Sequence, residues 1–269
     1  MEGKSFDFSL YERNLALEKT LGTQKFLKTG TTICAACFDG GAVLGADTRA
    51  TAGPVVQVKD EMKIHRISDN IWACGAGTAA DNDQITRLIS SKITLFQMNT
   101  GIEPRVDQVS TIFSKRLFKY QGYIQAYLIV AGVDYSGSSI YTIYAQGSAS
   151  KSPFAALGSG SMAAISVLEP RWRKGLNEDE CRELVADAIE AGITNDLGSG
   201  SNVNICVIKR GKEPKFYKDY RVTNPRNFNW QTKEEVLQTT KPEVLIETVR
   251  PRIESPIQLE VFDGIAEPL

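Results

Sequence analysis

The single histidine limits the nucleophilic chemistry that this chain can perform. A serine or cysteine nucleophile with a histidine base would need His65, because the 269-residue sequence contains no other histidine. His65 lies in a Lys-Ile-His-Arg run without a Gly-x-Ser-x-Gly turn. Ser159, between Gly158 and Gly160, does not supply that turn either, since the fifth position is Met162. We therefore interpret His65 as a structural or pocket-lining residue.

Metal, phosphate and dinucleotide sites are not predicted. Cys34 and Cys37 have the spacing of a zinc half-site, but there is no second such pair. Residues three apart on a strand also point to opposite faces. Walker and dinucleotide-binding glycine patterns are absent from the sequence. We expect no metal and no cofactor, and we interpret the five cysteines as buried, reduced thiols.

A threonine, an aspartate and a lysine remain as candidates for chemistry. Thr31 follows Gly30 where a polar leader meets a strand-favouring run. Asp47 ends an apolar stretch, and Lys63 lies in an alternating stretch where its side chain could point inward. Each feature alone is also typical of ordinary structure: a strand boundary, a turn cap and a solvent-facing lysine.

Hydrophobic patterning predicts the elements that would position these residues. Strand pairs are expected at 31–38 with 41–46, 123–133 with 138–145, and 202–209 with 215–220. Helix pairs are expected at 79–98 with 105–120, and 162–173 with 177–195. This order is not a strict βα alternation. It predicts an α+β fold in which antiparallel sheets stack face to face with helix pairs outside.

Charge and composition exclude several partner classes. The formal net charge is -1, from 31 Lys and Arg against 32 Asp and Glu, so no overall attraction to nucleic acid or anionic membrane is expected. No apolar run approaches the roughly 20 residues that span a bilayer. Half of the ten prolines follow residue 222, which indicates an extended tail. The tail's apolar residues favour contact with a partner over a free tail in solvent.

Several ordered blocks then suggest a family. They lie at residues 30–32, 45–49, 63, 75–81, 120–122, 157–161 and 195–202. On these blocks the chain resembles the catalytic β subunits of the eukaryotic 20S proteasome, an N-terminal threonine hydrolase family, and in particular its trypsin-like type-2 group. The match is colinear from Thr31 to about Tyr220.

The resemblance implies a fold and a division of the chain. The expected fold is a four-layer αββα sandwich of two stacked antiparallel sheets flanked by helix pairs, the Ntn-hydrolase fold. Residues 1–30 would be a propeptide, removed by autocatalytic cleavage between Gly30 and Thr31. Residues 31–221 would form the catalytic domain, and residues 222–269 a tail that contacts a neighbouring β subunit.

The resemblance also implies a catalytic group. Its members are Thr31, Asp47, Lys63, Ser159, Asp196, Ser199 and Gly77. Thr31 would supply the nucleophilic hydroxyl and, once freed, an α-amine that acts as base, with a reference pKa of about 7.7–8.0. Lys63, held by Asp47, would lower the pKa of both groups. The two serines and Asp196 would hold the amine, and the Gly77 N–H would face the oxyanion.

The matching positions predict substrate preference. The implied substrate-binding residues are Ala50, Thr51, Glu61, His65, Gly75, Ala79 and Asp83. A small floor at Gly75 with acids around it should admit Lys or Arg, while Thr51 and Ala79 should offer backbone groups to the peptide. Glu61 departs from the family pattern, which commonly has a smaller cysteine. It could deepen the basic preference or point into a subunit contact.

Together these points predict a threonine endopeptidase subunit of the 20S core, cleaving unfolded or ubiquitin-targeted polypeptides after basic residues. Expected partners are the other α and β subunits of a four-ring core particle, regulatory and assembly factors, and polypeptide substrates, in cytoplasm and nucleus. A non-catalytic scaffold subunit and a small-molecule amidase are the alternatives. The presence of Thr31, Asp47 and Lys63 disfavours the first, and the full-chain match disfavours the second.

Overall fold

The computed structural model describes residues 9–21 and 29–223. The leader contains one helix, α1 (Ser9–Leu21), which the weak hydrophobic pattern of this region did not predict. The predicted extended tail at 222–269 lies almost entirely outside the described residues. Within the described ranges, no helix combines the length and the apolar character needed to cross a bilayer.

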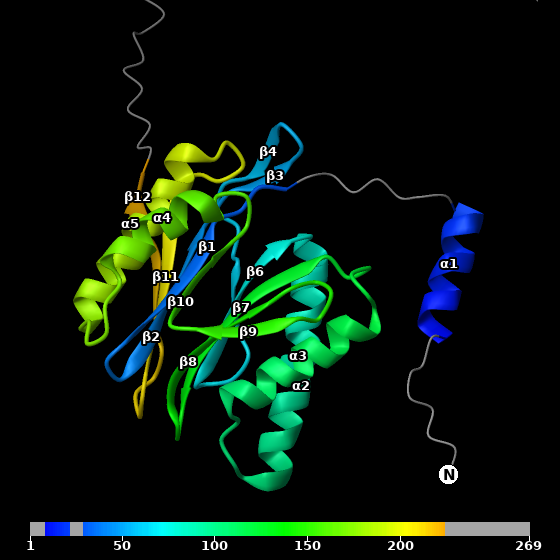
Figure 1. Ribbon diagram of the computed structural model, residues 1–269, viewed down its shortest axis with the longest axis horizontal. Coiled ribbons are helices and arrows are strands. Elements are labelled where there is room, and N and C mark those ends of the chain that lie inside the picture. Colours follow the sequence, from blue (N-terminus) through cyan, green and yellow to red (C-terminus); the bar gives the residue numbers. More distant parts are fainter. Residues whose placement is uncertain (1–8, 22–28, 224–269) are drawn as a thin grey trace, which may run out of the picture. The chain divides into compact units, whose positions relative to one another are not determined.

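Two five-stranded antiparallel sheets form the centre of the fold (Figure 1). The first has the order β10 (Phe154–Leu157), β1 (Ile33–Phe38), β2 (Gly41–Asp47), β11 (Asn202–Lys209), β12 (Lys215–Val222). The second has the order β5 (Ile64–Arg66), β6 (Ile71–Gly77), β7 (Ala126–Asp134), β8 (Gly137–Ile143), β9 (Ala149–Ser152). A separate hairpin pairs β3 (Ala50–Ala52) with β4 (Val55–Val58).

Helix pairs cover the outer faces of the two sheets. Figure 1 shows α4 (Ser161–Arg171) and α5 (Glu178–Asn195) over the first sheet, and α2 (Ala79–Thr100) and α3 (Val106–Lys119) over the second. Three clusters of buried apolar side chains separate these layers: helix from sheet, sheet from sheet, and sheet from helix. The predicted four-layer αββα sandwich is therefore confirmed.

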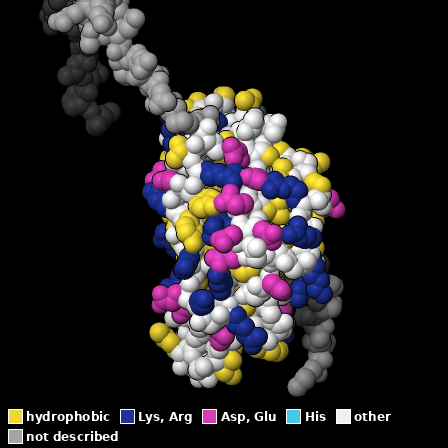
Figure 2. All heavy atoms as spheres, turned by 90° about the vertical axis from the view of Figure 1, so that its left-hand side faces the viewer, with side chains coloured by type: hydrophobic (Ala, Val, Ile, Leu, Met, Phe, Trp, Pro, Cys, Tyr) yellow, Lys and Arg dark blue, Asp and Glu magenta, His cyan; other side chains and the backbone are white. Residues whose placement is uncertain are grey.

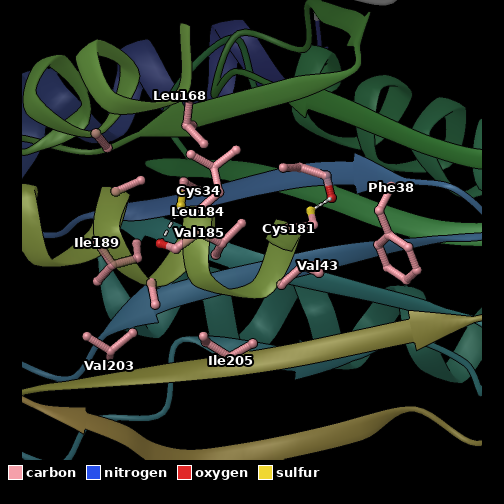
Figure 3. Close-up of a cluster of buried hydrophobic side chains, with 14 of the residues drawn as sticks. Cys34, Phe38, Val43, Leu168, Cys181, Leu184, Val185, Ile189, Val203 and Ile205 are labelled. Carbon is pink, nitrogen blue, oxygen red and sulfur yellow. Dashed lines mark hydrogen bonds between the residues drawn. The ribbon is translucent and has the colours of Figure 1, made fainter. Parts of the chain in front are cut away.

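The cluster under α5 shows how the sequence builds these layers. Leu184, Val185 and Ile189 lie at helical spacing on α5 and pack against Cys34 and Val43 of the first sheet (Figure 3). All five side chains are at most 2% exposed. Burying each such side chain stabilises the fold by about 1.5–3 kcal/mol relative to exposure. A continuous apolar layer thus fixes α5 on the sheet.

Alternation along β1 places its two cysteines on opposite faces. Cys34 belongs to the cluster between sheet and helices, whereas Cys37 packs against the cluster between the two sheets. Because the two sulfur atoms face different layers, their sequence spacing does not form a joint metal-binding pair.

The predicted helices and hairpins are present with ends shifted by a few residues, but several strands were not predicted. β3, β5, β9 and β10 have only three or four residues each, too few for a visible alternation. β6 is covered on one face by the first sheet and on the other by the helices of its own side. Its sequence, IWACGAG, consists mostly of small residues. Its hydrophobic pattern therefore lacks the period of two on which the prediction depended.

Ion pairs hold α5 to β12. Arg221 contacts Glu183, Asp187 at 2.6 Å and Glu190 at 2.8 Å. Figure 2 shows this side of the molecule, with basic and acidic side chains interleaved. The face therefore has no large area of one sign, in agreement with the near-neutral composition.

Strand register brings Thr31 and Asp47 together at one end of the strands of the first sheet. Ile33 at the start of β1 pairs with Ala46 near the end of β2 and with Leu157 at the end of β10. Asp47, in turn, pairs with Val203 at the start of β11. Two strand starts and two strand ends therefore meet directly beside Thr31.

Candidate active site

A buried ion pair lies against the Thr31 hydroxyl. The Lys63 ammonium donates to Thr31 Oγ1 at 3.1 Å and to Asp47 Oδ1 at 2.7 Å. Asp47 is fully buried, Lys63 is 8% exposed and Thr31 6%. Three residues that are 16 to 32 positions apart in the chain thus form one nearly buried polar group.

Backbone groups complete the surroundings of Asp47. Its carboxylate accepts N–H hydrogen bonds from Thr32 and Gly200, at 3.0 and 3.1 Å, and from Arg49 at 3.3 Å. Burial raises the pKa of Asp47, opposed by the charge of Lys63. Burial likewise lowers the pKa of Lys63, opposed mainly by Asp47. Burial therefore lowers the free energy needed to convert the ionised Lys63–Asp47 pair into its neutral form. This property suits a pair that exchanges protons with Thr31.

A second set of polar groups surrounds the Thr31 nitrogen. Thr31 N–H donates to Ser159 Oγ at 3.0 Å, and both Ser159 and Ser199 donate to Asp196 Oδ2 at 2.6 Å. Burial alone would raise the pKa of Asp196, but the serine hydrogen bonds, the Gly198 N–H and Lys63 outweigh it and lower the pKa. The group is therefore built around an ionised Asp196.

The bond between Gly30 and Thr31 is intact in this structure. The Thr31 hydroxyl donates to the Gly30 carbonyl oxygen at 2.7 Å, which places the hydroxyl beside the carbonyl of the preceding residue. A Cβ on Gly30 would lie 2.1 Å from Gly198 Cα. Only glycine fits at position 30 without moving the backbone.

Gly77 has a backbone conformation that favours glycine. Its φ is +96°, and a Cβ there would lie 2.4 Å from the Gln125 carbonyl oxygen. Gly77 lines the same cavity as Thr31, and its carbonyl accepts from the Thr29 hydroxyl at 2.9 Å. The predicted oxyanion role of the Gly77 N–H stays a prediction.

All of the predicted substrate-binding residues line one cavity of about 520 Å³, together with Thr31, Lys63 and Gly77. They are Ala50, Thr51, Glu61, His65, Gly75, Ala79 and Asp83. Asp47, Ser159, Asp196 and Ser199 are not among the lining residues. Asp47 contacts Lys63 and Ser159 contacts the Thr31 nitrogen, whereas Asp196 and Ser199 are linked to that nitrogen through Ser159. Asn82 packs closely against Gly75 at the floor, since a Cβ on Gly75 would lie 2.8 Å from Asn82 Cγ.

His65 is half-buried in the cavity wall on β5, paired with Ala73 of β6. Burial lowers the pKa of His65, with Asp83 acting against this shift and Arg87 in its favour. The imidazole is therefore neutral at pH 7, and it adds no positive charge to the cavity.

The two acids of the cavity differ in their partners. Asp83 accepts from Arg87 Nε at 2.9 Å, one helical turn away on α2. Glu61 has no ion pair with any residue in the described part of the chain. Glu61 is therefore the carboxylate left available to a bound cation.

Comparison with known proteins adds the family. The sequence matches the family model described as "Proteasome subunit" over residues 27–208. It is 49% identical over 227 residues to proteasome subunit beta type-2 of Saccharomyces cerevisiae, covering 84% of this chain and 86% of the relative. It is 45% identical over 263 residues to proteasome subunit beta type-7-A of Arabidopsis thaliana, covering 97% and 95%. The chain belongs to the proteasome β-subunit family.

Membership confirms the resemblance seen in the sequence. Proteasome β-subunit relatives imply threonine peptidase activity, and a proteasome subunit assembles with other proteasome subunits. The Thr31 site agrees with this activity, because a threonine hydroxyl contacts a buried lysine beside a cavity.

Arg87 and Asn82 are residues of this proteasome subunit's cavity that sequence reasoning missed. The i, i+4 spacing of Asp83 and Arg87 on a helical pattern was the available signal for the first. Asn82 gave no signal, since its closeness to Gly75 arises from packing of α2 on β6.

Replacing Lys63 with methionine should destabilise the fold, because it leaves the Asp47 carboxylate buried without a counter-charge. We expect a loss of about 3–5 kcal/mol in the free energy of unfolding of the full chain at pH 7. Because the pKa of Asp47 then rises further, the loss should shrink as the pH falls and the carboxyl group takes up a proton. Urea unfolding at pH 7 and pH 5 measures both effects.

The control is Lys218→Met, which breaks an exposed ion pair with Asp60. It should cost much less, because solvent screens that pair. Equal losses for the two variants would contradict a supporting role for Lys63.

Proposed function

We propose that this β subunit cleaves polypeptides after basic residues, with the Thr31 hydroxyl as nucleophile and the freed Thr31 α-amine as base. The observation that carries the proposal is the position of Thr31 Oγ1, 3.1 Å from the Lys63 ammonium and 2.7 Å from the Gly30 carbonyl oxygen. The proposal continues with the division predicted from the sequence: propeptide 1–30, catalytic domain 31–221 and tail 222–269.

The first step in this account is self-cleavage. Thr31 Oγ attacks the Gly30 carbonyl carbon, and the hydroxyl proton passes to the Thr31 nitrogen as the C–N bond breaks. The product is an ester between Gly30 and the Thr31 side chain with a free α-amine. Water then hydrolyses the ester and releases the leader as a carboxylic acid. Gly30 suits this step because it permits the close approach to Gly198.

Peptide hydrolysis repeats this chemistry on a substrate. The Thr31 amine takes the hydroxyl proton while Oγ attacks the substrate carbonyl, and the amine then protonates the leaving nitrogen. Water, deprotonated by the same amine, hydrolyses the acyl-enzyme. The positive charge of Lys63 lowers the pKa of the Thr31 hydroxyl and so favours its deprotonation. The Gly77 N–H stabilises the oxyanion of the tetrahedral intermediate.

The cavity supports a preference for Lys and Arg. Gly75 adds no side chain of its own to the floor, and Glu61 offers a carboxylate without a competing ion pair among the described residues. Asp83 is already paired with Arg87, so it contributes less net charge. A guanidinium or ammonium group would gain a charge-assisted hydrogen bond to Glu61.

The proposal extends to assembly and location. We infer that the tail at 222–269 contacts a neighbouring β subunit in a four-ring core particle with α and β subunits, regulatory factors and assembly factors. The particle would act in cytoplasm and nucleus on unfolded or ubiquitin-targeted chains. The apolar residues between the tail prolines support contact with a partner.

Thr31→Ala should abolish hydrolysis of peptides with arginine before the scissile bond, because it removes the nucleophile. Assembled particles carrying this variant should retain less than about 1% of the wild-type rate, as expected for loss of a covalent nucleophile. The control is Thr111→Ala, an exposed threonine on α3 whose hydroxyl bonds only the Asp107 carbonyl. Undiminished cleavage by Thr31→Ala particles would assign the activity elsewhere and leave this subunit as a scaffold.

Glu61→Gln should selectively weaken cleavage after arginine. The variant keeps the shape of the side chain but removes its charge, so kcat/KM should fall about ten-fold for an arginine peptide, mainly through KM. The rate for a matched peptide with leucine before the scissile bond should not fall.

The matched control is Asp60→Asn, the neighbouring acid, which pairs with Lys218 and does not line the cavity. An unchanged arginine preference in Glu61→Gln, or an equal loss in Asp60→Asn, would contradict the specificity assignment.

A further inference from the structure

The side chain of Thr32, next to the nucleophile, makes a buried hydrogen bond that the mechanism above does not use. Thr32 is fully buried, and its Oγ1 lies 2.7 Å from Ser199 Oγ. Its backbone N–H separately donates to Asp47. In the sequence, Thr32 stood out only as part of the block at residues 30–32 that carries the family resemblance.

The Thr32 hydroxyl closes a ring of hydrogen bonds that begins and ends on adjacent residues. From Thr31 N–H the ring passes to Ser159 Oγ at 3.0 Å, to Asp196 at 2.6 Å, to Ser199 at 2.6 Å, and returns to Thr32 Oγ1 at 2.7 Å. The covalent bond between Thr31 and Thr32 completes it. A change at Thr32 therefore reaches the Thr31 nitrogen by two routes.

Proton positions give the ring a direction. Ser199 uses its one hydroxyl proton on the Asp196 carboxylate, so toward Thr32 it acts as acceptor and Thr32 is the donor. Donation from Thr32 polarises Ser199 and strengthens its bond to Asp196. Thr32 is thus the outermost donor of one of the two arms that converge on this carboxylate.

Packing restricts the rotamer of Thr32. A Cβ built on Gly160 would lie 1.9 Å from Thr32 Oγ1, and one built on Gly192 would lie 2.4 Å from both Oγ1 and Cγ2. Gly160 precedes α4 and Gly192 lies on α5, so backbone from both helices closes around the side chain. The hydroxyl is therefore held toward Ser199.

We propose that Thr32 is a positioning residue for the reaction, and that its hydroxyl acts through Ser199 and Asp196 to hold the freed Thr31 amine in its catalytic orientation. The inference rests on the proposed function of Thr31. None of Thr32, Ser199, Asp196 and Ser159 lines the substrate cavity. Loss of the hydroxyl should therefore change kcat and leave KM unaltered.

Three variants separate hydrogen bonding from packing. Thr32→Val keeps the shape of the side chain but lacks the hydroxyl. Thr32→Ala removes the hydroxyl and the methyl group, and so cannot overfill the space beside Gly160. Thr32→Ser keeps the hydroxyl. In assembled particles we expect Thr32→Val and Thr32→Ala to lower kcat about five- to ten-fold with KM unchanged, as for the loss of one buried hydrogen bond. The kcat of Thr32→Ser should stay within about two-fold of wild type. Intact mass gives the fraction of cleaved chain, and kcat is expressed per cleaved chain after subtracting the rate of Thr31→Ala particles.

A double-mutant cycle tests the route through Ser199. If Thr32 acts through Ser199, then Thr32→Ala combined with Ser199→Ala should have the same kcat as Ser199→Ala alone. The matched control is Thr86→Val, a buried threonine whose hydroxyl bonds only the Asn82 and Asp83 carbonyls of its own helix. It should not change kcat.

Outcomes that overturn the inference are distinct from failure of the proposed function. Wild-type kcat in both Val and Ala, a loss in Ser equal to that in Ala, or additive losses in the cycle would each contradict a role for the hydroxyl. The proposed function fails instead if Thr31→Ala particles cleave arginine peptides at the wild-type rate. The two results come from different variants in the same assay.

Discussion

The contact between Lys63 and Asp47 is the interaction on which this site depends. Neither charge would be tolerated alone at such burial, so each requires the other, and the backbone N–H groups around Asp47 are needed as well. The ion pair and the hydrogen bonds to Asp47 therefore fix the end of β2, the residue before β5 and the turn after α5 relative to one another. Thr31 lies where those three segments meet, with its hydroxyl on the lysine.

Glycines provide the second constraint, because the site brings backbone segments closer than a side chain allows. Gly30 lies against Gly198, and a Cβ on Gly158 would be 2.1 Å from the Thr31 carbonyl oxygen. Gly158 also has φ +95°, a conformation that L side chains rarely adopt. The sandwich therefore holds the start of β1 in close backbone contact with the turn before α4 and the turn after α5.

The sequence predicted the architecture better than the site. Long periodic segments such as α5, with its Asn177 and Glu180 capping box, were recognisable because burial imposes a period. β6 was not, since both of its faces are buried. Thr31, Asp47 and Lys63 were individually ordinary, and only the resemblance to a family joined them, because contacts across 16 to 32 residues leave no local pattern. Arg87 had only its i, i+4 spacing from Asp83 as a signal, and the role of the Thr32 hydroxyl became visible only through the partner that packing gives it.

The central claim is that this geometry cuts the chain before Thr31 and so creates the base that the nucleophile needs. The most direct test is the intact mass and N-terminal sequence of this subunit isolated from assembled, active particles. The account predicts a single chain that begins at Thr31, with the leader absent. A chain that still begins at Met1, or one cut at another bond, would contradict it, because Thr31 would then have no free amine.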